Sequence, residues 1–374
     1  MQSKITQALD SIDIKIGGDR PWDIQVHDSR FYKRIAKEPS LGLGESYMDG
    51  WWDCNALDQF FFRVCRSLNI AKVYNVSTFI TFLVKHFFRN EQSRLLSKKV
   101  AEVHYNLGNE LYQLMLGPSM AYTCGYWQNT NALTAAQNQK YDLVCRKLHF
   151  KEGERILELG CGWGGFAHYA AQHYGVEMHS VNIANEQMAF AADLCKGLPV
   201  SLYTCDYRDV KVYNPSGIKF DKVVSIGMCE HVGQKNYPTF LQLVRHNLKD
   251  NGLFLLHTIG KNRTLSFTDP WIRKYIFPSG QLPTIKLISS ASEAHFVIED
   301  LHNFSADYDK TLMAWQQNFV QSWGTIKSHY DERFYRMWNY YLLSCAGGFR
   351  ARTLQLWQFI FSPQGEVGGY VSIR

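Results

Sequence analysis

Short apolar runs alternate with helix-compatible segments from about residue 150 to the end of the chain. Seven runs have the length and the β-branched and aromatic content of buried strands. They cover residues 155–159, 176–183, 200–205, 222–226, 253–257, 295–301 and 355–361. This alternation predicts an α/β fold with a Rossmann-like, mostly parallel sheet that helices cover on both faces. A ligand of such a sheet binds at the carboxyl ends of the strands.

The rest of the pattern predicts a smaller domain and a helical insertion. Residues 1–75 mix strand and helix patterns, which indicates a small N-terminal α+β domain. Residues 305–350 form an aromatic-rich helical segment before the last strand, which we expect to act as a lid over an apolar pocket. We therefore predict three parts, namely a small domain over 1–75, a linker helix over 76–100 and a large α/β domain over 101–374. Within the small domain the predicted strands are 12–16 and 24–26, and the predicted helices are 31–37 and 57–68.

Positive charge gathers ahead of the large domain. Residues 63–99 carry eight Lys and Arg side chains and a single acid, Glu91, and apolar positions recur at helical spacing through part of this segment. A basic helix with an aromatic face suits an anionic lipid surface. An ordinary amphipathic helix, packed on its neighbour with a solvated basic face, explains the same pattern equally well.

Composition adds a large core and a mild positive charge. Of the 374 residues, 46% are hydrophobic and 14% are aromatic, so the aromatic side chains fill a core or line a pocket that stabilises a cation. The net charge of +6 suits an anionic surface but is far from the signature of a nucleic-acid-binding protein.

The cysteines indicate reduced thiols. Nine cysteines are scattered along the chain without a CxxC pair or a Cys/His zinc spacing, so we predict no metal site. The Met1 end has no apolar signal segment, and no window approaches the roughly 20 apolar residues of a membrane helix. We therefore expect a cytoplasmic protein that is able to lie on a membrane.

A glycine-dense turn follows the first predicted strand of the large domain. Gly160, Gly162 and Gly165 fit the dinucleotide pattern G-x-G-x-x-G, which is typical of dehydrogenases. Glu158 with Gly160, Gly162 and Gly164 also fits E/D-x-G-x-G-x-G, the S-adenosylmethionine turn of class I methyltransferases. In both patterns the glycines let backbone N–H groups approach the ligand closely.

The next strands favour S-adenosylmethionine. A dinucleotide site places an acid at the end of the second strand, whereas this strand ends in Asn182. Asn182 and Gln187 offer neutral hydrogen bonds instead. Asp206, after the third strand, stands where class I methyltransferases hold the adenine amino group. Glycine turns of this kind bind many nucleotides, so the turn alone decides nothing.

Three groups able to transfer protons follow three different strands. Glu230, His257 and Tyr308 lie at or beyond strand carboxyl ends, where we expect them to converge beside the cofactor. A carboxylate, an imidazole and a phenol in one apolar pocket suit proton transfer, because burial and mutual hydrogen bonds tune their pKa values. Taken singly, they also fit a carboxylate at a helix start, a buried structural histidine and a lid residue. Cys345 is a weaker candidate nucleophile, since alkylation by a sulfonium needs none.

Several motifs together resemble the cyclopropane fatty acid synthase and mycolic acid cyclopropane synthase family over nearly the whole chain. The ordered set is more specific than the glycine turn alone. Its members are residues 44–52 (GESYMDGWW), 161–165 (CGWGG), 230–233 (EHVG), 257–260 (HTIG), 275–278 (YIFP) and 349–352 (FRAR).

The resemblance implies a reaction and a set of site residues. Members transfer a methylene group from S-adenosylmethionine to a cis double bond of a phospholipid acyl chain, through a carbocation that a bound bicarbonate deprotonates. The implied bicarbonate ligands are the side chains of Glu230, His257 and Tyr308 with backbone groups of Cys124 and Ile259, and Cys345 is singled out as well. The implied cofactor contacts are Tyr122, Thr123, Glu158, Gly160, Gly162, Gly164, Asn182, Gln187 and Asp206.

The resemblance also sets expectations about partners and location. It implies a homodimer formed through the N-terminal domain, with 101–374 as the catalytic domain, docked peripherally on the anionic inner leaflet of the cytoplasmic membrane. Two alternatives stay open. A lipid methyltransferase would use the same cation but leave a methyl branch, and a lipid-binding protein would carry a dead cofactor site.

Overall fold

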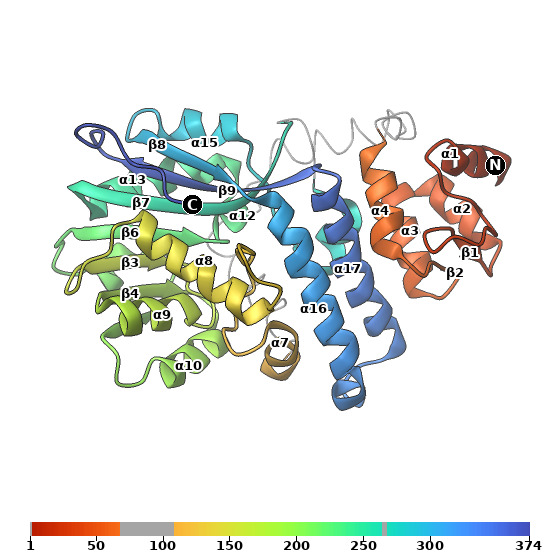
Figure 1. Ribbon diagram of the computed structural model, residues 1–374, viewed down its shortest axis with the longest axis horizontal. Helices are drawn as coiled ribbons and strands as arrows, with labels where there is room; N and C mark the ends of the chain where they lie inside the picture. Colours follow the sequence, from red (N-terminus) through yellow and green to blue (C-terminus); the bar gives the residue numbers. More distant parts are fainter. Residues whose placement is uncertain (1, 68–107, 264–267) are drawn as a thin grey trace. The chain divides into compact units, whose positions relative to one another are not determined.

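The computed structural model describes residues 2–67, 108–263 and 268–374 (Figure 1). The chain divides into two compact units. Unit 1 draws on the ranges Met1–Glu91, Phe267–Pro278 and Tyr308–Leu354, and unit 2 on Gln92–Ser266, Ser279–Asp307 and Gln355–Arg374. This division does not test the roles that we predict for residues 1–75, 76–100 and 101–374, which stay predictions.

Unit 2 is built on a seven-stranded sheet with the order β5-β4-β3-β6-β7-β9-β8 (Figure 1). The pairs β3–β4, β4–β5, β3–β6 and β6–β7 are parallel, and β8 runs antiparallel to β9. The mostly parallel α/β sheet confirms the predicted fold class. Its strands are β3 Arg155–Leu159, β4 Glu177–Asn182, β5 Val200–Thr204, β6 Phe220–Ile226, β7 Leu248–Lys261, β8 Val297–Asn303 and β9 Leu354–Ser362.

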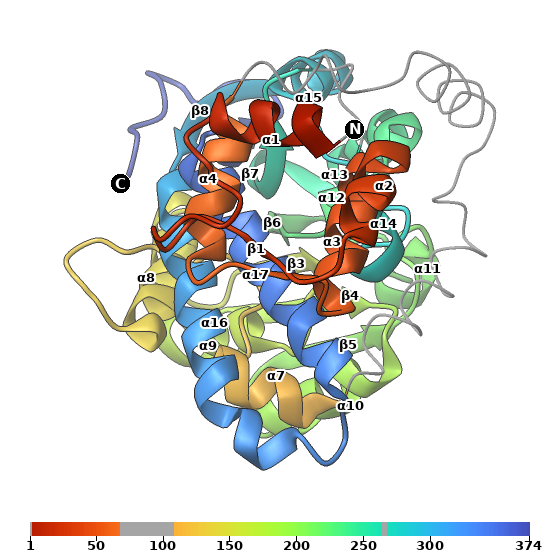
Figure 2. The same ribbon diagram turned by 90° about the vertical axis from the view of Figure 1, so that its right-hand side faces the viewer.

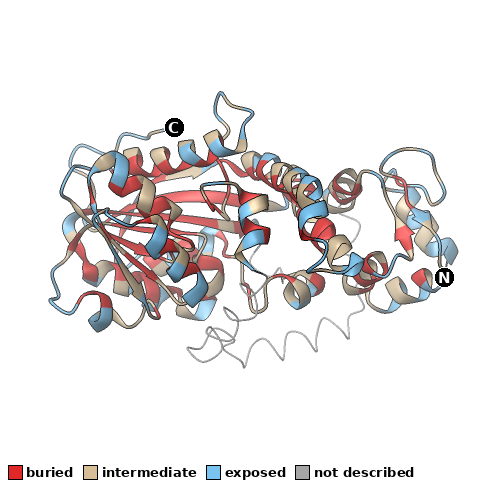
Figure 3. Ribbon diagram, turned by 90° about the horizontal axis from the view of Figure 1, so that it is seen from below, coloured by how far each residue is buried: buried red, intermediate tan, exposed pale blue. Residues whose placement is uncertain are grey.

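Helices cover both faces of this sheet, which is why its central strands read as continuous apolar runs. One buried cluster joins alternate strand residues such as Leu157 and Phe254 to α13, and another joins Ile156 and Leu255 to α8 and α9. Figure 3 shows the central strands as mostly buried. The helices of unit 2 are α7 Asn109–Leu116, α8 Leu133–Lys147, α9 Gly165–Tyr174, α10 Asn185–Leu194, α11 Val210–Tyr213, α12 Cys229–Val232, η2 Gln234–Asn236, α13 Tyr237–Asn247 and α15 Ile285–Ser292.

Unit 1 is largely helical, with one two-stranded antiparallel ladder between β1 and β2. Helices α4 and α17 pack along each other, and Gly347 of α17 allows the close approach because a Cβ there would lie 2.7 Å from the carbonyl oxygen of Asp58 (Figures 1 and 2). The elements are α1 Gln2–Asp10, β1 Gln25–Val26, α2 Arg30–Lys37, α3 Pro39–Met48, β2 Trp52–Asp53, α4 Leu57–Arg66, α14 Pro270–Tyr275 and α17 Glu332–Arg350, while α16 Ser305–Ile326 begins in unit 2 and continues here.

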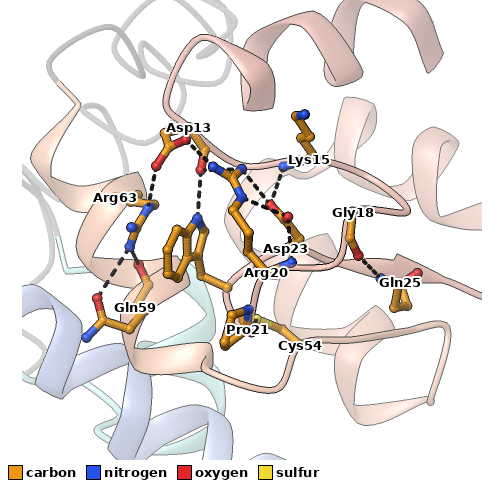
Figure 4. A network of polar contacts seen from close by, with 11 residues as sticks. Asp13, Lys15, Gly18, Arg20, Pro21, Asp23, Gln25, Cys54, Gln59 and Arg63 are labelled. Atoms are coloured by element: carbon orange, nitrogen blue, oxygen red, sulfur yellow. Dashed lines mark hydrogen bonds and ion pairs between the residues drawn. The ribbon is translucent and has the colours of Figure 1, made fainter.

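A compact ion-pair network closes the N-terminal loops of unit 1 (Figure 4). The Arg20 guanidinium bonds the buried Asp23 at 2.8 and 2.9 Å and also pairs with Asp13, to which Arg63 of α4 donates at 3.3 Å. These charged hydrogen bonds hold the pKa of Asp23 at about 2. The network therefore ties the first loops to α4 without a long strand.

The N-terminal segment differs from its predicted pattern at one of its two strands. Residues 12–16 contribute only an isolated bridge between Ile16 and Ile24, because the chain turns at Asp13 (φ 62°). The basic segment 63–99 and the linker 76–100 lie largely outside the described residues. Among the residues that are described, no helix is long and apolar enough to cross a membrane.

Candidate active site

The candidate active site begins where the strand order of unit 2 reverses. From the central strand β3, the chain builds β4 and β5 on one side, and β6 and β7 lie on the other. Connections leave a crevice at the carboxyl ends of the strands at such a switch point, which is where ligands of open α/β sheets bind. The glycine turn follows β3 and Glu230 follows β6, so both lie at this edge.

The glycine turn uses backbone conformations that other residues rarely adopt. Gly160, Gly162 and Gly164 have φ angles of 86°, 54° and 81°. A Cβ on Gly160 would lie 2.8 Å from Cβ of Met228, whereas a Cβ on Gly162 would meet no atom within 4 Å. Gly160 is therefore required by the packing of the protein itself, and Gly162 keeps the open side of the turn free.

Glu158 is a buried carboxyl group next to this turn. Its side chain is 2% exposed, and the hydroxyl of Ser180, its partner across β3–β4, donates to Oε2 at 2.8 Å. Burial raises the pKa of Glu158 to about 7, and the Ser180 hydrogen bond and the nearby Lys140 oppose that rise. The predicted cofactor-side acid is thus held by protein groups.

The amides of Asn182 and Gln187 bind each other at the end of β4. Nδ2 of Asn182 donates to Oε1 of Gln187 at 2.8 Å and to the carbonyl of Gly162 at 3.2 Å, and Oδ1 accepts from the N–H of Ile183 at 2.9 Å. These hydrogen bonds fix the shape of the glycine turn, and contacts from Asn182 and Gln187 to the cofactor stay a prediction.

Asp206 is already paired in the structure. The guanidinium of Arg208, two residues further on, donates to both carboxylate oxygens at 2.7 and 2.6 Å, and the Arg208 N–H adds a third bond at 2.9 Å. This local pairing holds the carboxylate in one orientation beyond β5. A contact from Asp206 to an adenine amino group stays a prediction.

Glu230 lies on the short helix α12 and reaches across to β7. Its Oε1 accepts the backbone N–H of Ile259 at 2.6 Å, whereas among the described residues Oε2 is buried without a hydrogen-bond partner. Burial raises the pKa of Glu230 to about 7, and the Ile259 bond opposes that rise. Since Oε1 accepts a hydrogen bond, a proton on the neutral acid sits on Oε2 and makes it a donor.

His257 lies two residues before Ile259 on the same strand. Its Nδ1 is 3.2 Å from Nε2 of Gln358 on the neighbouring strand β9, and no described residue bonds its buried Nε2. Burial lowers the pKa of His257 well below its usual range, and the positive charges of Lys140 and Lys147 add to that effect. Ile259 connects the two groups, because its N–H holds Glu230 beside the strand that carries His257.

The segment ahead of α8 carries the predicted Tyr122, Thr123 and Cys124. Tyr122 packs edge-on against Tyr112 of α7 at 5.4 Å between ring centroids. Cys124 is fully buried, and the methyl carbon of Thr123 lies beside Gly227 at the end of β6, where a Cβ would be 2.9 Å from it. The segment thus lies beside the end of β6, and the implied contacts of Tyr122, Thr123 and Cys124 with ligands stay predictions.

Lys140 is the main site residue that the sequence analysis missed. It lies on α8, is 1% exposed, and donates from Nζ to Oγ1 of Thr123 at 3.0 Å. Burial lowers its pKa to about 7, with Cys124 and Glu158 opposing that shift. Its signal was present, because Lys140 stands four residues from both Ala136 and Val144, on the apolar face of the helix.

Tyr308 and Cys345 belong to unit 1. The Tyr308 ring is buried and stacks on Phe349 of α17 at 4.5 Å between centroids. Burial raises the pKa of the Cys345 thiol to about 12, which disfavours the thiolate that a nucleophile requires. The convergence of Tyr308 with Glu230 and His257, and any role of Cys345, stay predictions. The described parts of the chain hold no group of His, Cys, Asp and Glu suited to a metal ion.

Known proteins share this arrangement over most of the chain. A family model described as mycolic acid cyclopropane synthetase matches residues 92–359. Cyclopropane-fatty-acyl-phospholipid synthase of Escherichia coli is 48% identical over 363 residues, which cover 97% of this chain and 93% of the relative. Tuberculostearic acid methyltransferase UfaA1 of Mycobacterium tuberculosis is 30% identical over 89% of this chain and 81% of its own.

Solved structures agree with the sequence matches. Mycolic acid cyclopropane synthase CmaA1, complexed with SAH and CTAB, superimposes with a TM-score of 0.65 and 26% identity, covering 71% of this chain and 97% of that one. The glycine turn, the α/β sheet and the full-length match point the same way. The chain belongs to the mycolic acid cyclopropane synthetase family.

Proposed function

We propose that this enzyme transfers a methylene group from S-adenosylmethionine to the cis double bond of an unsaturated phospholipid acyl chain. The observation that carries the proposal is a pair of buried polar atoms, Oε2 of Glu230 and Nε2 of His257, that no described residue bonds. They lie at the sheet edge that carries the glycine turn. The likeness to a phospholipid-modifying synthase and to a structure with bound SAH supports the substrate pair.

The proposed reaction has two steps. The electron pair of the alkene forms a bond to the methyl carbon as the carbon–sulfur bond breaks, which leaves S-adenosylhomocysteine and a carbocation. A proton then leaves the new methyl group, and its C–H electron pair closes the three-membered ring. The site must therefore exclude water, which would quench the cation, and accept a proton without presenting a strong permanent anion.

The residues fit a small oxyanion such as bicarbonate, which would supply a weak base for the departing proton. A buried polar atom without a partner costs about 1–3 kcal/mol, so two of them at the same sheet edge indicate a ligand with matching groups. Neutral Glu230 offers a donor at Oε2, and neutral His257 offers a donor at Nε2 when its other nitrogen accepts. In this proposal Ile259 acts by holding Glu230, and Tyr308 and the Cys124 backbone complete the set.

We also propose where the substrate is met. Residues 1–75 and the basic segment that follows dock the catalytic domain on anionic phospholipid at the cytoplasmic side of the membrane and hold a homodimer. The net charge of +6 and the basic run at 63–99 support this assignment. Lys98→Glu with Lys99→Glu should weaken binding to anionic vesicles in a co-sedimentation assay. Unchanged binding would refute the docking role, and light scattering tests the dimer.

Deuterated S-adenosylmethionine gives the deciding assay. The protein is incubated with CD3-labelled cofactor and vesicles of mono-unsaturated phospholipid, and saturated phospholipid serves as the control. We expect the acyl chains to gain one carbon with two of the three deuterium atoms and to lose the alkene, because one deuteron departs before ring closure. Retention of all three deuterium atoms would identify a branched methyl product, the chemistry suggested by the 30% identical methyltransferase. No label in lipid would reject both reactions.

A further inference from the structure

Gln358 is a buried amide in an otherwise apolar strand. It lies on β9 with 0% exposure, between Trp357 and Phe359, which point into the opposite core. Its Nε2 is 3.2 Å from Nδ1 of His257, and its Oε1 is buried without a hydrogen-bond partner among the described residues. Burying an amide costs free energy unless it is bonded, so the contact with His257 is what this side chain provides.

The direction of this hydrogen bond decides which imidazole nitrogen carries the proton. The Gln358 amide turns its nitrogen toward the ring, and in this orientation it donates and Nδ1 of His257 accepts with its lone pair. A neutral imidazole with a free lone pair on Nδ1 carries its proton on Nε2. The resulting N–H group is the buried Nε2 that no described residue bonds.

The surroundings of His257 keep the ring neutral. Lys140, Lys147 and His302 all disfavour a charge on the imidazole, and the ring of Phe304 lies 5.6 Å away between centroids. Of these groups, Lys147 has its own partners, with Nζ 3.0 Å from Nδ1 of His302. A doubly protonated His257 is therefore opposed from α8 and from β8, and only the choice between two neutral tautomers remains.

We propose that Gln358 is a positioning residue that holds His257 in the tautomer protonated on Nε2, and so presents a fixed N–H donor to a bound oxyanion. The tautomer follows from the hydrogen bond itself, and only its catalytic consequence rests on the proposed function. In the other tautomer Nε2 would be an acceptor, and it would repel a carboxylate-like oxygen instead of binding it.

Nitrogen-15 NMR on the full-length protein tests this assignment directly. Long-range proton–nitrogen spectra of 15N-histidine-labelled enzyme report the protonated nitrogen, and His257→Gln identifies the signals of His257. We expect the wild type to show the proton on Nε2. At pH values where the introduced carboxyl is ionised, Gln358→Glu should move it to Nδ1, because a carboxylate can only accept, and Gln358→Met should give a mixture. Gln355→Met, a buried glutamine of the same strand bonded to Ser305, is the matched control and should leave the tautomer unchanged.

Kinetics separate a positioning role from a structural one. We expect Gln358→Glu to lower kcat by about tenfold or more with little change in KM for S-adenosylmethionine, since the loss concerns proton transfer alone. Should that variant fail to fold, Gln358→Met still decides the point through its spectrum. A proton on Nδ1 in the wild type, or an unchanged tautomer in both Gln358 variants, would overturn the inference. If lipid assays fail while the tautomer behaves as described, the proposed function falls and the role of Gln358 stands.

Discussion

The buried carboxyl groups on the two sides of the switch point differ in their hydrogen bonding. On the β4 side, Oε2 of Glu158 accepts from Ser180 and the amides of Asn182 and Gln187 bond each other. On the β6 side, Oε2 of Glu230 has no hydrogen-bond partner among the described residues. Burial raises the pKa of both carboxyls to about 7, so burial does not distinguish them.

The difference shows which side shapes the site and which side binds within it. Polar groups that bond each other fix a backbone, here the glycine turn, at little net cost. Buried polar atoms without partners cost stability, and proteins retain them where a ligand or a reaction needs them. We therefore infer that the β4 side gives the crevice its shape and that, in the proposed function, the Glu230–His257 side provides the chemistry.

Replacing Glu230 should have the largest effect on turnover. Glu230→Ala removes both the donor that the neutral acid offers at Oε2 and the acceptor for the Ile259 N–H. We expect kcat to fall by about 10²- to 10⁴-fold, the usual contribution of a positioned proton-transfer group, because the base is no longer held. The vesicle assay measures it, with the exposed Glu177→Ala as the control that keeps activity. A loss of kcat below about threefold would contradict the inference that the β6 side, and not the β4 side, provides the chemistry.

Replacing Glu158 should act on stability and its pH dependence. A carboxyl whose folded pKa is raised favours the folded state below the unfolded pKa of 4.5, and that contribution is lost as pH rises through about 7. Relative to wild type, Glu158→Gln should therefore gain stability between these values, by up to about 3 kcal/mol at 1.36 kcal/mol per pKa unit. Urea unfolding at a series of pH values measures the gain. A constant difference across this window would show that Glu158 does not titrate as described.

Two glycine variants should separate packing from ligand approach. Gly160→Ala places a Cβ 2.8 Å from Met228 and should cost about 1–3 kcal/mol of unfolding free energy. Gly162→Ala meets no protein atom and should cost only about 1–2 kcal/mol for its left-handed backbone. We expect KM for S-adenosylmethionine to rise in Gly162→Ala, as calorimetric cofactor titration would confirm. Unchanged cofactor affinity in Gly162→Ala would contradict the inference that the cofactor approaches the turn on the side of Gly162.

Replacing Cys345 should have the smallest effect. Its thiol pKa of about 12 leaves almost no thiolate near neutral pH, so Cys345→Ala should turn over at a near-normal rate. The same vesicle assay applies, and circular dichroism checks that the buried site tolerates the smaller side chain. A large loss of kcat in a well-folded variant would return Cys345 to the mechanism.

The sequence predicted most of the sheet and part of the site. The strands were visible because residues on both faces of the sheet are buried, such as Leu157 on one face and Ile156 on the other. The side-chain partners across neighbouring strands could not be predicted, because spacing along the chain does not say which side chains meet. Lys140 on the apolar face of its helix and Gln358 in an apolar strand were each a single polar position, which indicates a buried polar group but does not identify its partner. The pairing of Asp206 with Arg208, only two residues away, was local enough to have been foreseen.

The central claim is that Glu230 and His257 hold a small oxyanion that serves as the base. Turnover of the wild type should be measured in buffer stripped of carbon dioxide under inert gas, with bicarbonate added back in steps. We predict a low basal rate that rises and saturates with bicarbonate, and a Glu230→Ala variant that gains little from the same additions. A wild-type rate that is full without bicarbonate and unchanged by its addition would contradict the account.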